Sequence, residues 1–203
     1  MQPARVQRTE KRPIALHDRA MDNLRFIRET MERSTSFTAV SGVAGMIMGA
    51  VAMVAAVVAS TRRTPEAWLL TWLIAALVAG LAALWAMIRK ARASGVSLLS
   101  GPGSKFALFF TPPIVVGALL TAALVRVDLL SVLPGAWLLL YGTAVVSGGA
   151  FSVRIVPMMG VGFMLVGALA LFAPPAWGDE FMAVGFGVLH IVFGLVIWRK
   201  HGG

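Results

Sequence analysis

Of 203 residues, 58% are hydrophobic and 13% are charged, and the mean hydropathy is +0.82; a soluble domain needs more polar surface, so the composition indicates an integral membrane protein. The formal net charge of +9 gathers at the ends of apolar segments, which favours membrane orientation over nucleic-acid binding. The chain has no cysteine, which excludes disulfides, thiolate metal sites and cysteine nucleophiles.

The N-terminal segment precedes any long apolar run and carries eight Lys or Arg residues. Residues 1–13 are expected to form a polar basic tail. Between residues 14 and 34, apolar side chains recur at helical spacing and predict an amphipathic helix. Two positions for this helix stay open: on the cytoplasmic leaflet, where Arg side chains meet anionic lipid, or docked on the bundle or a partner protein. The apolar positions are Ala20, Met21, Leu24, Ile27 and Met31.

Six apolar runs follow, each of about 20 residues, the length that a helix needs to cross about 30 Å of hydrocarbon. They predict an all-α, polytopic membrane protein whose six-helix transmembrane domain occupies residues 35–203. The third run contains Pro112-Pro113 and the fifth contains Pro157, and both sites are expected to mark a first helical turn, where proline costs least. The predicted spans are about 37–60, 66–88, 105–126, 131–150, 154–173 and 179–198.

The distribution of positive charge predicts the orientation. Fifteen of the 18 Lys and Arg residues lie on the side that holds the N-terminus, and three (Arg62, Arg63 and Arg126) lie on the other. Positive charge in short loops stays in the cytoplasm, so both termini are expected on the cytoplasmic side of the inner membrane. The residues expected to orient the helices or contact lipid headgroups are Arg89, Lys90, Arg92, Lys105, Arg154, Arg199 and Lys200.

Tryptophans are expected to form two interfacial bands. The outer band would hold Trp68, Trp72, Trp137 and Trp177, and the inner band Trp85 and Trp198.

Ionisable groups are scarce inside the predicted spans. No Asp, Glu, Lys or Arg falls at mid-bilayer depth, which disfavours a proton pump or an antiporter for charged substrates. His190 is the exception and the single weak candidate for a cofactor ligand, such as a haem ligand; the alternative is a hydrogen bond to a neighbouring helix. No catalytic residue, metal site or cofactor is predicted.

Glycines recur at seven-residue intervals within several spans, so each set lies on one helix face. Small residues let helix backbones approach in lipid, which predicts tight helix packing. Constant index sums pair Gly160 with Gly194 and Gly167 with Gly187 across the last two spans, and would set Met164 opposite His190. The packing glycines are Gly42, Gly45, Gly49, Gly135, Gly142, Gly149, Gly160, Gly167, Gly187 and Gly194.

These features favour a non-catalytic accessory or scaffold subunit of a larger membrane assembly. Its expected partners are membrane lipids and other membrane subunits or further copies of the chain, and not nucleic acid. One alternative is a small permease for a neutral or lipid-like solute. The other is a haem-binding electron-transfer anchor through His190. The permease would use Pro112-Pro113 and the polar residues Thr121, Tyr141, Thr143 and Ser147.

The predicted orientation can be tested with single cysteines, because the native chain has none. Ser97→Cys and Ala176→Cys should react with a membrane-impermeant maleimide from opposite sides, Ala176→Cys from outside intact cells and Ser97→Cys only after lysis. Labelling of both positions in intact cells would show the topology to be wrong.

Overall fold

A computed structural model describes residues 21–27, 31, 40–93 and 101–201 of the chain. Residues 1–35 and 36–203 form two compact units, and each is described by itself. In the first unit, residues 21–27 are helical and lie within the segment predicted as an amphipathic helix. The predicted polar tail, the rest of that segment and residues 94–100 lie outside the described residues.

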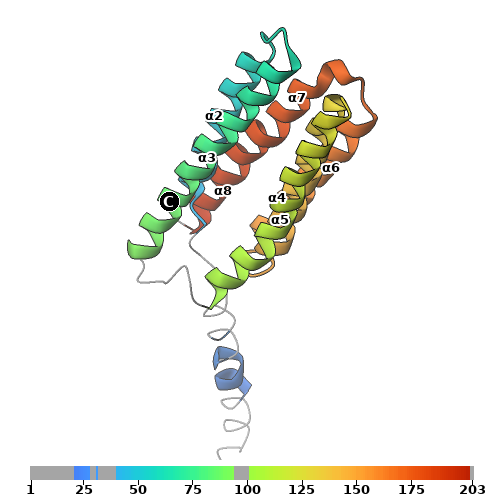
Figure 1. The fold of residues 1–203 in the computed structure, drawn as a ribbon. Helices are drawn as coiled ribbons and strands as arrows, with labels where there is room; N and C mark the ends of the chain where they lie inside the picture. The colour runs from blue at the N-terminus through green and yellow to red at the C-terminus, as the bar shows by residue number, and fades with distance from the viewer. Residues whose placement is uncertain (1–20, 28–30, 32–39, 94–100, 202–203) are drawn as a thin grey trace, which may run out of the picture. The chain divides into compact units, whose positions relative to one another are not determined.

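In its described residues the second unit is all-α and holds six helical spans long and apolar enough to cross a membrane, which confirms the predicted polytopic fold. The last span is a continuous run in which a π-helical segment separates two α-helical ones (Figure 1). In chain order the elements are α2 (Gly42–Ala59), α3 (Pro65–Ala93), α4 (Pro102–Arg126), η1 (Leu130–Val132), α5 (Leu133–Gly149), α6 (Ile155–Phe172), η2 (Pro175–Trp177), α7 (Gly178–Met182), η3 (Ala183–Leu189) and α8 (His190–His201).

Helix starts and stops follow local chemistry. Ser41 caps α2, because its hydroxyl oxygen accepts the backbone N–H of Ala44 at 3.3 Å. Gly101, with a φ of 55°, and Pro102 at the first helical position begin α4. Asp128 follows α4 with a φ of 57°, a left-handed conformation that Asp tolerates better than most residues.

Close backbone contacts at glycines hold four of the helical spans in two antiparallel pairs. In the pair α5 and α6, a Cβ added at Gly142 would lie 2.7 Å from the carbonyl oxygen of Gly160, and one added at Gly160 would lie 2.7 Å from that of Gly142. In the pair of α2 and the last span, a Cβ at Gly194 would lie 2.8 Å from the carbonyl oxygen of Gly42. Only glycine permits this backbone contact, so both pairs depend on it.

The predicted pairing of α6 with the last span through glycine is therefore wrong. The face of α6 that carries Gly160 and Gly167 packs on α5, and Gly187 and Gly194 on the last span meet α2. The rule of constant index sums still describes the observed pairs: Gly42 lies against Gly194, and Gly49 lies against Gly187. The prediction chose the wrong partner helix. Several helices carry the same seven-residue glycine spacing, so spacing alone cannot show which of them pack together.

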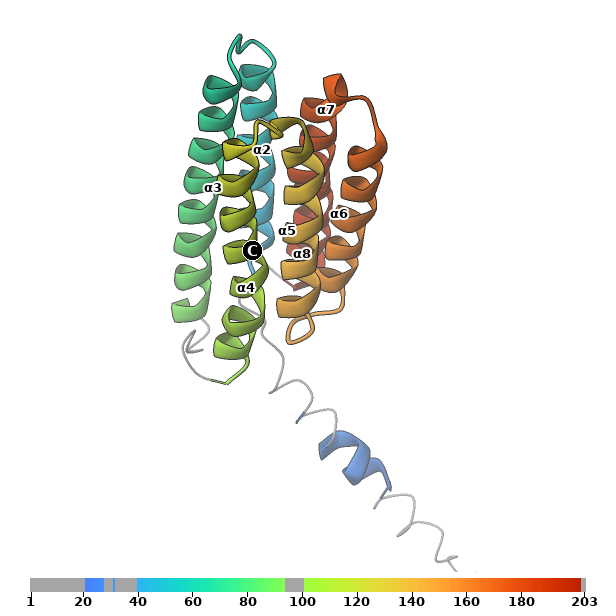
Figure 2. The ribbon, with the colours of Figure 1, turned by 45° about the vertical axis from the view of Figure 1, so that its right-hand side comes forward.

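The two remaining helices lie at the periphery. α3 packs mainly on α2, and α4 packs mainly on α5 (Figure 2). α4 comes close to α5 at Gly148, where an added Cβ would lie 3.0 Å from the Phe106 carbonyl oxygen. Both peripheral helices leave large apolar side chains exposed along their length.

The prolines of α4 are a second correction to the sequence analysis. Pro112 and Pro113 lie in the interior of α4 and do not begin it, whereas Pro157 lies in the first turn of α6 as expected. The helix continues through both prolines, because a membrane favours helical backbone over irregular structure. Beside the prolines, the Thr111 hydroxyl donates to the carbonyl of Ala107 at 2.7 Å.

Gly160→Ala should destabilise the protein by about 1–3 kcal/mol, because its Cβ meets backbone on α5 and the helices must separate. Gly80→Ala is the matched control, since an added Cβ there has no neighbour within 4 Å. Thermal or denaturant-induced unfolding in detergent measures the difference. Equal stability of the two variants would contradict the backbone contact.

Candidate functional site

His190 lies in the bundle with only 2% of its surface exposed. Its Nδ1 is 3.0 Å from the carbonyl oxygen of Phe186, and its Nε2 is 2.8 Å from the hydroxyl of Tyr141. A carbonyl only accepts, so Nδ1 carries the proton, and in the neutral ring Nε2 accepts from the tyrosine hydroxyl. The expected hydrogen bond of His190 to a neighbouring helix is thus confirmed, because Tyr141 lies on α5, but the predicted position of Met164 opposite His190 is wrong. Met164 instead faces Gly142.

The carbonyl that His190 uses belongs to the π-helical segment η3, because Phe186 lies within it. At the end of η3 the backbone N–H of His190 bonds to the carbonyl of Gly187. Such π-helical turns occur often at functional sites.

Aromatic rings surround this histidine and form a central aromatic cluster, which we define as Phe110, Tyr141, Phe163, Phe186 and His190. The rings of Tyr141 and Phe163 lie 4.9 Å apart, and those of Phe163 and His190 lie 5.1 Å apart, both in edge-to-face arrangements. Phe163 is fully buried. The cluster joins α4, α5, α6 and the last span.

The polar residues proposed for a permease path bond within the protein. The Thr143 hydroxyl donates to the carbonyl of Leu139 at 2.9 Å, in its own helix. The Thr121 hydroxyl accepts the indole N–H of Trp137 at 2.8 Å and donates to Gly117. The bond between Trp137 and Thr121 ties α5 to α4, whereas that of Thr143 stays within α5.

A second polar cluster, which sequence reasoning missed, lies at the distal end, defined as the end that holds residues 60–64, 127–129 and 173–177. There Asp179 accepts two indole N–H groups on one carboxylate oxygen, from Trp68 at 2.7 Å and from Trp72 at 3.1 Å. Trp68 also stacks on Trp137, with ring centroids 5.9 Å apart. The carboxylate thereby ties α3 to α7, two helices far apart in sequence.

The signal for this cluster was present in the sequence. Trp68 and Trp72 are four residues apart and so share one face of α3, and Asp179 begins the last span at the same depth. These tryptophans were predicted to lie in an outer interfacial band. Three of the four also donate hydrogen bonds within the protein.

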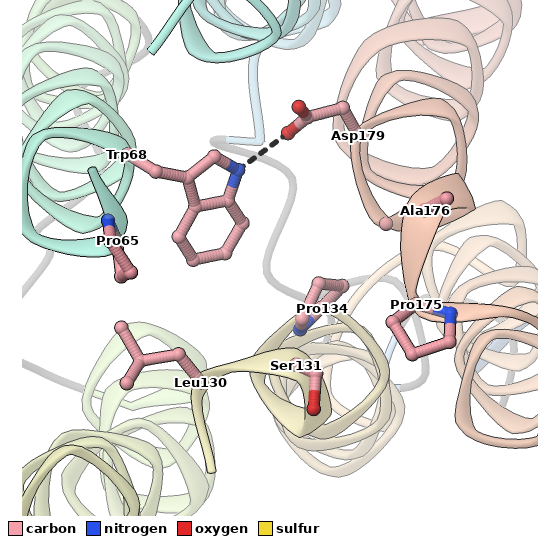
Figure 3. A pocket seen from close by; sticks show the side chains of 9 residues that line it. Pro65, Trp68, Leu130, Ser131, Pro134, Pro175, Ala176 and Asp179 are labelled. Carbon is pink, nitrogen blue, oxygen red and sulfur yellow. Dashed lines mark hydrogen bonds between the residues drawn. The ribbon is translucent and has the colours of Figure 1, made fainter. Parts of the chain in front are cut away.

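Beside Asp179 the distal end holds an open pocket of about 280 Å³. Its wall comes from the start of α3, the η1–α5 junction and the η2–α7 junction (Figure 3). Apolar and polar groups both line it, and the polar side-chain groups among its lining residues are the carboxylate of Asp179, the hydroxyl of Ser131 and the indole N–H of Trp68. Its principal lining residues are Pro65, Trp68, Ser131, Pro134, Pro175 and Asp179.

The basic residues predicted to orient the helices do not form one site. They lie at the end of the bundle opposite the distal end, which we call the proximal end. Three lie in the last turns of α3, one in the first turn of α4, one before α6 and two at the end of α8. Lys90 donates to the carbonyl of Val40 at 3.2 Å, and the Arg89 guanidinium lies 5.5 Å from the Trp85 ring. Lys105 lies 5.9 Å from the Phe151 ring.

Tyr141→Phe should destabilise the protein by about 1–2 kcal/mol, because the imidazole Nε2 then lies buried without its donor. Thr143→Val is the matched control, since that hydroxyl bonds only within its own helix. Unfolding in detergent measures both variants. An undiminished stability of Tyr141→Phe would show that the hydrogen bond contributes nothing.

Comparisons of the chain with protein-family models, with curated proteins and with solved structures found no match.

Proposed function

We propose that this chain is a non-catalytic accessory or scaffold subunit of a larger assembly in the cytoplasmic membrane, with both termini on the cytoplasmic side. The observation that carries the proposal is the surface of α4. None of its 18-residue apolar window is buried within the chain, whereas 39% of the window of α2 is buried. Most of the circumference of α4 is thus available to a neighbouring protein.

The prolines of α4 also place backbone hydrogen-bond acceptors on this apolar surface. Pro112 and Pro113 have no backbone N–H, so the carbonyls of Leu108 and Phe109 lose their helical donors. The side chains of these two residues and Pro112 are exposed. In hydrocarbon an unpaired carbonyl costs on the order of a few kcal/mol, and lipid tails cannot donate. A hydroxyl or amide side chain on the helix of another subunit can donate, which supports a protein neighbour for this face.

Neither alternative function gains a comparable observation. A permease needs a polar cavity between its helices, and the rings of Tyr141, Phe163 and His190 pack edge to face between α5, α6 and the last span. A haem anchor needs a free imidazole nitrogen, but both nitrogens of His190 have hydrogen-bond partners. Both observations favour a packed structural element.

Hydrogen bonding within the protein gives the scaffold reading further support. The buried polar side chains are engaged with each other or with backbone, as in a scaffold. Basic residues at the proximal helix ends support the cytoplasmic orientation.

Site-specific photo-crosslinking in native membranes tests the proposal. A photoreactive amino acid at Leu108 or Leu119 on α4 should yield an adduct with another polypeptide. The matched controls are Leu165 and Leu169 on α6, which are similarly exposed. Mass spectrometry identifies the adducts. Adducts with lipid alone, or equal yields from α6, would contradict an α4 docking face, and adducts only with a second copy would replace the accessory role with self-association.

The double variant Pro112→Ala/Pro113→Ala should separate stability from association. Alanine restores both backbone N–H groups, so α4 satisfies its own carbonyls and the isolated chain gains up to about 3 kcal/mol. The same change removes the need for an external donor, so the adduct yield from Leu108 should fall. An unchanged yield would show that the prolines have no part in the contact.

A further inference from the structure

The distal pocket has a composition suited to one class of ligand. It combines a half-buried carboxylate, an indole ring and three proline rings, and it is open at the end of the bundle (Figure 3). Its volume of about 280 Å³ is below that of a typical drug-sized site and fits a small headgroup.

The charge of Asp179 is not neutralised by a cation within the described part of the chain. Two indole N–H groups stabilise one oxygen, but neither carries a positive charge. Arg62 and Arg63 belong to the same end, yet both are exposed and neither forms an ion pair with Asp179. The negatively charged Glu66 and Glu180 are also exposed there. The pocket therefore presents a net negative charge beside an aromatic wall.

We propose that the distal pocket binds an alkylammonium group, with Asp179 providing the counter-charge and Trp68 a cation–π contact. Aromatic rings attract organic cations through their quadrupole, most strongly for tryptophan, and the effect grows when water is displaced. The proline rings supply apolar surface for the methyl or methylene groups around the nitrogen. An anion is disfavoured by the carboxylate, and a small inorganic cation would leave the apolar wall without a partner.

Two sources can supply this group: the amine headgroup of a membrane lipid or a soluble alkylamine. Both share the chemistry that the pocket recognises, and the pocket lies at the end of the spans, where headgroups are found. The inference does not depend on the accessory role of α4, which lies on a different surface.

The soluble probe is choline, measured by ligand-observed NMR with the full chain in a neutral maltoside detergent. Its neutral isostere 3,3-dimethylbutan-1-ol is the control for charge. Choline should bind saturably and at least about tenfold more tightly than the alcohol. Absence of saturable choline binding, or equal affinity for the alcohol, would overturn the proposal.

Asp179→Asn should weaken choline binding by about tenfold or more, because it keeps an acceptor for the indoles but removes the charge. Glu180→Gln is the matched control, since it removes the neighbouring exposed charge and should leave binding unchanged. Ala176→Phe covers the case in which Asp179→Asn fails to fold. Ala176 lines the pocket and is exposed, so a phenyl ring should block binding while the Asp179 bonds remain. Unchanged binding in the folded Asp179→Asn or in Ala176→Phe would refute the site.

Native mass spectrometry of chain released from nanodiscs distinguishes the sources. Retention of phosphatidylethanolamine but not phosphatidylglycerol by the wild type, lost in Asp179→Asn, would assign a lipid headgroup. Choline binding without any retained lipid would assign a soluble amine. Preferential retention of phosphatidylglycerol would contradict an ammonium site.

Discussion

Backbone contact at glycine is the constraint on which the bundle depends. In hydrocarbon, apolar side chains gain nothing by leaving lipid for protein, so helices associate through close packing and polar contacts. At Gly142 and Gly160, and at Gly42 and Gly194, the helices approach until a single methyl group would collide with backbone. These contacts fix α5 on α6 and α2 on the last span, and they leave α3 and α4 to lie outside.

The placement of the polar groups follows from these two glycine-mediated helix pairs. With the register of each pair fixed, Tyr141 on α5 comes within hydrogen-bond distance of His190 on the last span, and Asp179 comes within reach of the α3 tryptophans. Among the described residues, no buried side-chain nitrogen or oxygen lacks a hydrogen-bond partner. The buried side chains are thus hydrogen-bonded as well as closely packed. The carbonyls beside Pro112 and Pro113 stand out against this background, because their helical donors do not exist.

Much of the fold could be predicted from the sequence. Hydrophobic length predicted six spans, because crossing hydrocarbon requires continuous apolar helix, and the observed bounds differ by only a few residues for most of them. Seven-residue spacing predicted which glycines share a face. The positions of Pro112 and Pro113 were misjudged, because a general preference for first turns ignores how a membrane enforces helicity on both sides of a proline.

By itself the sequence determined which segments are membrane helices, which faces carry glycine, and that His190 is the histidine inside a span, since these properties depend only on local composition and period. Tertiary structure alone decided which glycine faces meet. It also decided that both imidazole nitrogens are occupied and that Asp179 gathers two indoles beside a pocket. The bond between Trp68 and Asp179 alone joins residues 111 positions apart. Helices with the same spacing can be paired in several ways in a single sequence, and only the simultaneous packing of all six selects one.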